Sequence, residues 1–213
     1  MDNISVIIRN RNESEYIGFA IQSCLDHFDK PEIIIVDNNS TNDSLEVVNL
    51  FKDRTTIKVI TINDYTPGKS INMGVQKSNN DYILVLSAHA QITELNFNRV
   101  KEILDNHSAV MGQQNPIYKG KKISKRYIWS HFNDQPSVNM YSEIEGRQFL
   151  HNAFCFYKKE TLLEFPMPEQ YPGKEDRYWA IDMIDKGNSY WYTPEFKANH
   201  FYTGNGATWK GIG

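Results

Sequence analysis

The sequence predicts an α/β fold in which helices cover both sides of a mostly parallel sheet. Short apolar runs bounded by turn residues alternate with segments whose apolar residues recur at helical spacing. The clearest run, Ile33–Val36, has four β-branched residues and no polar alternation, which is typical of a strand buried on both faces. Strands separated by helices at this spacing imply parallel pairing through right-handed crossovers.

Length and composition narrow the class of protein. The 213 residues fit one domain, or one domain with a small annex, and can bury a full core. With 23 basic against 26 acidic residues and a net charge of -3, the chain is not expected to bind nucleic acid. Cys24 and Cys155 lack metal-binding spacing and are expected to be buried thiols in a reducing compartment.

The chain has no apolar run near the roughly 20 residues that span a bilayer. It begins with an expected strand followed by charged residues, which does not resemble a signal peptide. A cytoplasmic protein is the expectation.

The elements of the first half follow in alternation. A strand at Ile4–Ile8 precedes a helix with Ile17, Ile21 and Cys24 on its apolar face. The other expected strands are Ile33–Val36, Ile57–Ile62, Asp81–Leu86 and Ala109–Gln113. Three more helices are expected: one has Leu45 and Val48 on its apolar face, one begins at Pro67-Gly68, and one has Phe97, Val100 and Leu104 on its apolar face.

The turn after Ile33–Val36 is a candidate site. Ligands in an open α/β sheet bind outside the carboxyl ends of the strands, which is where Asp37 and Asn38 lie. Ser40 with Asp43 resembles a capping box for the next helix. The alternative is that Asp37 only shapes this turn.

The periodic pattern of apolar residues ends at Pro116. Residues 116–148 show little periodicity, and a loop of this length is usually functional. After an apolar run at Phe149–Tyr157, the pattern predicts a helix over Lys174–Lys186 and short strands at Tyr190–Tyr192 and Phe196–Tyr202. Five basic residues gather in the loop: Lys119, Lys121, Lys122, Lys125 and Arg126.

The sequence does not match the motifs of three common α/β proteins. A dinucleotide site needs glycines after the first strand, but residues 9–13 contain none. A P-loop needs a Gly where Asn63 stands, five residues before Gly68-Lys69-Ser70. A phospho-acceptor receiver domain needs acids after the first strand, where this chain has Arg9 and Arg11.

Four blocks resemble family 2 glycosyltransferases of the GT-A fold, from about residue 3 to 202. They are SVIIRNRNE, IIIVDNNSTNDS, PGKSINMGVQKSNNDYILVLSAHA and FPMPEQYPGKEDRYWAIDMIDKGNSYWYTPEFKANH. GQQNP and SAHA are most similar to a bacterial rhamnosyltransferase-like subgroup. The resemblance implies a Rossmann-like, mostly parallel sheet, with a nucleotide-sugar-binding half at 1–115 and an acceptor-binding and catalytic-base half at 116–213.

The resemblance assigns donor contacts to strand ends and to the third block. It implies that Asp37 and Asn38 hold the nucleoside, although the family often has two acids there. Arg9 and Arg11 would face the base or the diphosphate, since arginine binds phosphate bidentately. Lys69 and Asn72 would lie near the ribose or diphosphate; the alternatives are a surface ion pair for Arg11 and a capping role for Asn72.

The family's metal motif, Asp-x-Asp, is replaced by Ser87-Ala88-His89. Two alternatives stay open. His89, joined by His200, can ligate Mn²⁺ or Mg²⁺ in place of the acids. Otherwise the enzyme works without metal, and Arg9, Arg11 or Lys69 carries the charge of the leaving group.

Glu175 and Asp176 match the acidic pair that opens the family's acceptor helix, where the resemblance makes Asp176 the general base. The alternative is that both acids only favour a helix N-terminus. Because adjacent helical residues do not share a face, Glu175 is expected to point elsewhere.

The resemblance therefore implies an inverting enzyme that moves a sugar from a nucleotide-sugar donor to a bacterial surface glycan (capsule, O-antigen or lipooligosaccharide). The expected acceptor is a glycan or a lipid-linked glycan, with peripheral contact to the cytoplasmic face of the inner membrane. Its expected contacts are Lys121, Lys122, Lys125, Arg126 and Asn152. The rivals are an inactive sugar- or nucleotide-binding protein and a nucleotidyltransferase.

Overall fold

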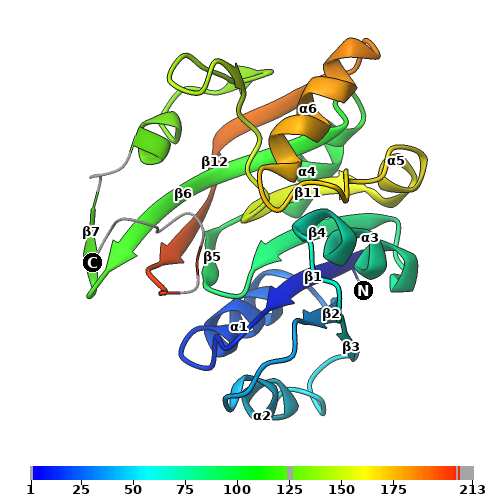
Figure 1. Cartoon of the computed structure of the whole chain (residues 1–213), viewed down its shortest axis with the longest axis vertical. Helices are drawn as coiled ribbons and strands as arrows, with labels where there is room; N and C mark the ends of the chain where they lie inside the picture. The colour runs from blue at the N-terminus through cyan, green and yellow to red at the C-terminus, as the bar shows by residue number, and fades with distance from the viewer. Residues whose placement is uncertain (1, 124–126, 205, 207–213) are drawn as a thin grey trace.

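The computed structural model of the protein describes residues 2–123, 127–204 and 206. Its ten-stranded sheet runs through the whole molecule in the order β3-β2-β1-β4-β11-β6-β12-β5, with the short strands β7 on β6 and β8 on β12 (Figure 1). The strands of this path are β1 Ile4–Asn10, β2 Glu32–Asp37, β3 Ile57–Thr61, β4 Tyr82–Ser87, β5 Ala90–Glu94, β6 Ala109–Tyr118, β11 Phe154–Lys158 and β12 Tyr190–Phe201. The α/β fold predicted from alternating strands and helices is confirmed.

The sheet is mixed in direction. Strands β1 to β4 are parallel to one another, and β12 is parallel to β6. Strand β11 runs antiparallel between β4 and β6, and β5 pairs antiparallel with β12 at the edge. Strands β1 to β4 thus form the parallel part, and β11, β6 and β12 continue the same sheet to β5 at the edge.

Helices cover both faces because the fully buried strands alternate their side chains between two apolar clusters. Ile7 and Ile34 pack with the face covered by α3, α5 and α6, while Ile8 and Ile33 pack with the face covered by α1, α2 and α4. The helices are α1 Ile17–His27, α2 Ser44–Asn49, α3 Pro67–Lys77, α4 Phe97–Leu104, α5 Lys159–Glu164 and α6 Glu175–Asp185. None of these helices is long and apolar enough to cross a bilayer.

Several local expectations differ from the structure. The two short strands expected near the end are one strand, β12, whose register shifts between Thr193 and Lys197. Strand β6 continues to Tyr118 because β12 pairs along it as far as Phe201. Strand β5 and helix α5 had no clear periodic signal, since each is only five or six residues long.

The described residues of 116–148, which are 116–123 and 127–148, form an annex of short strands and one 3₁₀ helix rather than a plain loop. A hairpin of β6 and β7, Lys121–Lys122, projects from the sheet, with Lys119 and Gly120 in left-handed conformations at its turn (Figure 1). The remaining pieces are the 3₁₀ helix Tyr127–His131 and the two-residue strands β8 Ser137–Val138, β9 Tyr141–Ser142 and β10 Arg147–Gln148.

The expected capping box at Ser40 is wrong. Helix α2 begins at Ser44 with Asp43 as its N-cap, and no side-chain cap bond is made there. The Ser40 N–H and hydroxyl donate instead to the carboxylate of Asp37, at 2.9 and 2.6 Å. Asp37 therefore holds the turn that follows β2.

Helix α3 packs so closely on β1 that Gly74 leaves no room for a side chain. A Cβ at Gly74 would lie 2.6 Å from Cγ2 of Ile7 and 2.9 Å from its Cγ1 and Cδ1. We expect Gly74→Ala to lower the free energy of unfolding by about 1–3 kcal/mol through overpacking, measured by urea denaturation.

A double-mutant cycle separates this contact from other effects. Ile7→Ala removes all three clashing atoms. In that background Gly74→Ala is expected to be neutral, or to stabilise by up to about 1 kcal/mol through helix propensity. An equal loss in both backgrounds would show that Ile7 is not the cause.

Candidate active site

A cavity of about 450 Å³ lies at the carboxyl ends of β1, β2 and β4, and its lining includes the start of α6. This is the edge of the sheet where open α/β folds bind ligands, and the volume suits a small molecule. Many of the predicted site residues line it: Arg9, Arg11, Asn38, Ser87, His89, Asn152, Glu175, Asp176 and His200.

The end of β1 brings a cation to the centre of this edge. Arg9 pairs in register with Ser87 of β4, so it lies beside the position of the family's first metal-binding acid. Its Nη1 lies 3.0 Å from Oε1 of Glu175, and only 18% of its side chain is exposed. Arg11 also lines the cavity and is exposed.

Both acids at the start of α6 are buried and both line the cavity. Glu175 accepts hydrogen bonds from Arg9 at 3.0 Å and from the Asn152 amide at 3.4 Å. The expectation that Glu175 points elsewhere is therefore wrong, because these two partners draw its carboxylate into the cavity. Burial and the adjacent charge of Asp176 raise the pKa of Glu175, against the opposing attraction of Arg9.

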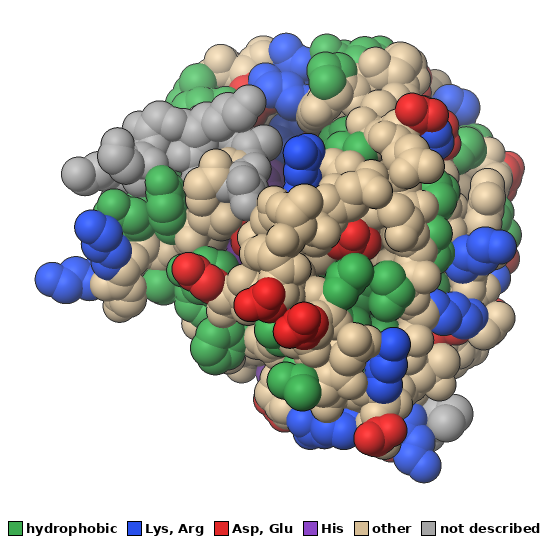
Figure 2. Space-filling model, turned by 60° about the horizontal axis from the view of Figure 1, so that its bottom comes forward, with side chains coloured by type: hydrophobic (Ala, Val, Ile, Leu, Met, Phe, Trp, Pro, Cys, Tyr) green, Lys and Arg blue, Asp and Glu red, His purple; other side chains and the backbone are tan. Residues whose placement is uncertain are grey.

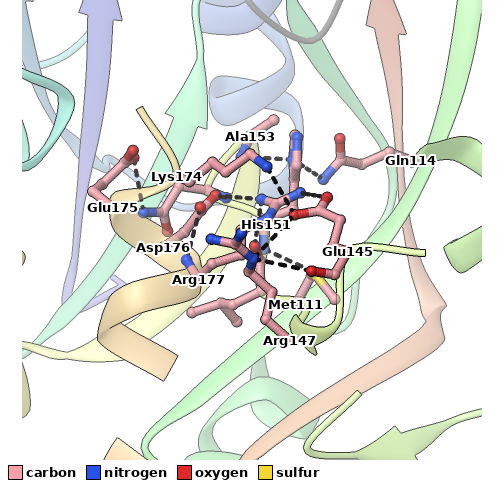
Figure 3. Close-up of polar contacts among 12 residues, drawn as sticks. Met111, Gln114, Glu145, Arg147, His151, Ala153, Lys174, Glu175, Asp176 and Arg177 are labelled. Carbon is pink, nitrogen blue, oxygen red and sulfur yellow. Dashed lines mark hydrogen bonds and ion pairs between the residues drawn. The ribbon is translucent and has the colours of Figure 1, made fainter. Parts of the chain in front are cut away.

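Asp176 has a different set of partners (Figure 3). Its Oδ2 accepts from the Asn152 N–H and from Nη1 of Arg177, both at 3.0 Å, and its Oδ1 accepts from the Arg177 N–H at 2.9 Å. Burial alone raises the pKa of Asp176, but the Arg177 guanidinium, His151 and the Asn152 N–H together outweigh burial, so this pKa lies below its ordinary value. The described contacts fill three of about four acceptor positions on the carboxylate, which leaves one for a hydroxyl donor.

Three histidines lie close together in the lining of the cavity. The ring of His200 lies 4.9 Å from that of His89 and 5.9 Å from that of His151, measured between centroids. Gln114 links two of them, with its Oε1 2.8 Å from Nδ1 of His200 and its Nε2 3.0 Å from Nδ1 of His151. Burial lowers the pKa of His200, and burial and Arg177 lower that of His151 to about 3, so both are neutral at pH 7.

These residues do not fit a divalent cation. His89 contacts Oε1 of Glu13 at 3.4 Å and the hydroxyl of Ser87 at 3.2 Å. Within residues 2–123, 127–204 and 206, no three His, Cys, Asp or Glu side chains are arranged to hold a metal. His89 and His200, the predicted metal ligands, are brought together with the carboxylate of Glu13, which is one acid where the Asp-x-Asp motif supplies the two that Mg²⁺ or Mn²⁺ prefers.

The turn after β2 contributes one residue to the lining. Asn38 lines the cavity, whereas Asp37 is buried behind it. The carboxylate of Asp37 accepts from Asn10 Nδ2 at 2.7 Å as well as from Ser40. Asp37 thus fixes Asn10, another residue of the lining, at the end of β1.

Two predicted donor contacts on α3 lie outside the lining. Nζ of Lys69 lies 3.7 Å from the exposed carboxylate of Asp64. The Asn72 amide donates to the Met167 carbonyl at 2.9 Å and accepts from the Met167 N–H at 2.9 Å, which ties α3 to the segment after α5. Asn72 neither caps its helix nor reaches the cavity.

Of the predicted basic acceptor contacts, the described ones, Lys121 and Lys122, also lie outside the cavity lining. Lys119, Lys121 and Lys122 are exposed on the projecting β6–β7 hairpin, while Lys125 and Arg126 fall outside the described residues. Figure 2 shows basic and acidic side chains interspersed over one face of the molecule, in keeping with the near balance of charge.

Several residues of the lining were not predicted: Glu13, Tyr65, Glu145, His151, Lys174 and Arg177. Glu13 and Arg177 fall inside the family-like blocks, beside residues that were chosen. Glu145 and His151 carry no local signal, because the contacts that bring them to the site, with Arg177 and with Gln114, join residues 32 and 37 positions apart.

The lowered pKa of Asp176 links this residue to acid stability. The ionised carboxylate contributes stability that is complete above the unfolded value of about 3.9 and is lost as pH falls through the lower folded value. Asp176→Asn is expected to cost about 3–5 kcal/mol near pH 7 by breaking a buried pair. The difference from the native protein should shrink below about pH 4, in urea titrations at several pH values; a constant difference would contradict the assignment.

Comparison with known proteins places this chain in a family. The model of Glycosyl transferase family 2 matches residues 5–165. An uncharacterized glycosyltransferase of Haemophilus influenzae is 31% identical over 116 residues, covering 50% of this chain and 44% of the relative. Poly(ribitol-phosphate) beta-N-acetylglucosaminyltransferase TarS of Staphylococcus aureus is 25% identical over 224 residues, covering 94% of this chain and 37% of TarS. The chain spans less than half the length of these relatives.

Solved structures agree on the fold. The S. aureus TarS fragment 1–349 in complex with UDP-GlcNAc superposes with a TM-score of 0.72 at 18% identity, covering 95% of this chain and 59% of that one. GalNAc-T7 with UDP, GalNAc and Mn²⁺ gives a TM-score of 0.70 at 15% identity, covering 93% and 44%. The predicted GT-A architecture is therefore confirmed, and this chain belongs to glycosyl transferase family 2.

Proposed function

We propose that the protein transfers a sugar, with inversion, from a nucleotide-sugar donor to a hydroxyl of a bacterial surface glycan. The observation that carries the proposal is Asp176, a buried carboxylate with a lowered pKa, in a cavity that also receives the carboxyl ends of β1, β2 and β4. Family membership supports sugar transfer, and the complexes of similar folds with UDP-GlcNAc or UDP support a nucleotide-sugar donor.

The proposed reaction is a single displacement at the anomeric carbon. Asp176 accepts the proton of the acceptor hydroxyl as that oxygen forms the new bond to the anomeric carbon. The bond between this carbon and the diphosphate oxygen breaks on the opposite face, and the nucleoside diphosphate leaves with the bonding electrons. Attack opposite the leaving group inverts the anomeric configuration.

The donor is proposed to lie along the strand ends, with the nucleoside at Asn38 and the turn held by Asp37. Arg9 and Arg11 lie at the same edge of the sheet, and arginine pairs bidentately with phosphate. We assign the charge of the departing diphosphate to these guanidinium groups, because Ser87 and His89 do not provide the acids that a hard cation prefers.

The acceptor is proposed to be anionic or lipid-linked. Lys119, Lys121 and Lys122 project together on the β6–β7 hairpin, and each basic residue near an anionic surface contributes about 1 kcal/mol. One similar protein acts, by its name, on poly(ribitol-phosphate), and another is a poly-beta-1,6-N-acetyl-D-glucosamine synthase of Staphylococcus epidermidis. The rhamnosyltransferase-like features of the sequence leave the transferred sugar open.

Two rival functions predict different products. An inactive sugar- or nucleotide-binding protein would bind the donor without turnover, and the replaced metal motif favours this rival. A nucleotidyltransferase would release pyrophosphate instead of a nucleoside diphosphate. Release of a nucleoside diphosphate from a panel of nucleotide sugars separates the transferase from the inactive protein, and release of pyrophosphate from a nucleoside triphosphate with a sugar 1-phosphate tests the nucleotidyltransferase.

Asp176→Asn tests the base directly. The amide cannot accept the hydroxyl proton, so kcat is expected to fall by at least about 100-fold while donor affinity is retained. Both are measured at a temperature where circular dichroism shows the variant folded. Glu175→Gln is the matched comparison and is expected to be milder; near-normal turnover of Asp176→Asn would move the base elsewhere.

Asp37→Ala tests the nucleoside site. Removing the carboxylate frees Asn10 and the Ser40 turn, so calorimetry should show weaker binding of the cognate nucleotide by roughly tenfold or more, about 1.4 kcal/mol. Ser40→Ala is the matched control, since it loosens the same turn and keeps the carboxylate. Unchanged affinity in Asp37→Ala would remove this turn from the donor site.

Removal of metal tests the assignment of Arg9 and Arg11. Activity is expected to survive exhaustive treatment with EDTA, because guanidinium groups supply the positive charge. Arg9→Gln is expected to lower kcat without creating a response to Mn²⁺. Loss of activity with EDTA that Mn²⁺ restores in the native protein, but not in His89→Ala, would establish the metal-dependent alternative.

A further inference from the structure

The guanidinium of Arg177 is fixed in one orientation beside Asp176 (Figure 3). The residue is 4% exposed. Its Nη1 donates to the Leu150 carbonyl at 2.7 Å and to Oδ2 of Asp176 at 3.0 Å, while its Nη2 lies 3.5 Å from Oε1 of Glu145. The guanidinium carbon lies 4.4 Å from the centroid of the Phe149 ring, within the range of a cation–π contact.

The ion pair between Asp176 and Arg177 joins neighbours in sequence, which do not normally face each other on a helix. Groups outside α6 hold it in place. The Leu150 carbonyl and the Phe149 ring come from the segment before β11, and this ring is itself stacked on His131 at 3.9 Å. The fold therefore directs Arg177 toward the carboxylate, which the helix geometry alone would not do.

Glu145 is the second anion that Arg177 meets. It lies between β9 and β10 in the annex, and only 4% of its side chain is exposed. Its carboxylate also lies 3.3 Å from Nζ of Lys174 and 3.9 Å from Nε of Arg147. Of these three cations, Arg177 is the one with a described contact to Asp176, so it links the two acids.

We propose that Arg177 and Glu145 are positioning residues that set the basicity of the catalytic carboxylate. Arg177 orients the Asp176 carboxylate and keeps it ionised, while Glu145 restrains the guanidinium and shares its charge. Without Glu145, the full charge of Arg177 would act on Asp176 and make it a weaker base. This inference rests on the proposed function, in which Asp176 is the base.

Other groups face Asp176 from each element packed around it. Glu175 on α6 and Arg9 on β1 pair with each other at 3.0 Å, so their charges partly cancel. His151 precedes β11 and is neutral at pH 7, with its pKa lowered to about 3 by burial and by Arg177. When protonated in acid, its charge adds to that of Arg177 in lowering the pKa of Asp176. Tyr157 and Cys155 on β11 are also neutral, because burial raises the pKa of each.

The test is a carboxyl ¹³C NMR titration of Asp176 in the full chain, with its signal assigned by comparison with Asp176→Asn. Arg177→Met removes the cation and should move the titration midpoint up by about 1–3 pH units. Glu145→Gln removes the competing anion and should move it down. Both variants disturb the same buried cluster, so opposite shifts cannot come from a shared structural loss.

Two further variants complete the design. Arg147→Gln is the control, because Arg147 is another cation partner of Glu145 but has no described contact with Asp176. It should leave the titration midpoint of Asp176 within about 0.3 pH units of the native value, which is about a twofold change in the protonation equilibrium. Arg177→Lys keeps a positive charge but lacks the planar guanidinium with its fixed donors, so it should lower the titration midpoint of Asp176 only part of the way back from the Arg177→Met value. If Arg177→Met does not fold, Glu145→Gln alone decides.

The inference is overturned if Glu145→Gln raises the midpoint or leaves it unchanged. The kinetic counterpart is the acid limb of kcat, which should move up in Arg177→Met with the midpoint. Near-normal turnover of Asp176→Asn would instead refute the proposed function, and the titration would still report whether Arg177 and Glu145 control this carboxyl.

Discussion

Two carboxylates buried side by side at the start of α6 are the constraint on which the rest of the site depends. Burying charge is costly unless partners replace the lost hydration. Glu175 receives Arg9 from the end of β1, and Asp176 receives Arg177 together with the Asn152 N–H. These partners come from separate elements, so the acids can be buried only when the sheet, the segment before β11 and α6 are all in place.

The antiparallel strand β11 explains how the second half of the chain reaches the site. Parallel strands β1 and β4 end at the cavity, whereas an antiparallel neighbour begins there. Because Phe154 of β11 pairs with Leu86 near the end of β4, the residues just before it, His151 and Asn152, fall at the same edge. A wholly parallel sheet would place the start of this strand at the opposite edge, away from Asp176.

The sequence patterns predicted the strands and the edge of the sheet that holds the site, because these depend on residues close together in the sequence. The run Ile33–Val36 predicts a strand because β-branched residues suit a strand buried on both faces, and polar residues after parallel strands must meet at one edge. The predictions failed where distant contacts decide: Asn72 binds Met167, and the Ser40 hydroxyl accepts from Asn10 and Asn12, 30 and 28 residues away, instead of capping α2. The contact of Glu145 with Arg177, 32 residues away, is likewise encoded by no periodicity.

The two acids show how the same burial gives adjacent carboxylates opposite properties. Burial raises the pKa of both, yet only Asp176 has an arginine fixed by further acceptors, while the Arg9 contact of Glu175 does not outweigh the charge of Asp176. Acids whose pKa values are pushed apart are suited to different tasks in one reaction. In the proposed reaction Asp176, with the lower pKa, is the carboxylate that stays ionised as the base, whereas Glu175 is the more easily neutralised when the donor diphosphate approaches Arg9. The proposed assignment thus puts a base next to the reacting carbon without holding two full negative charges against an anionic donor.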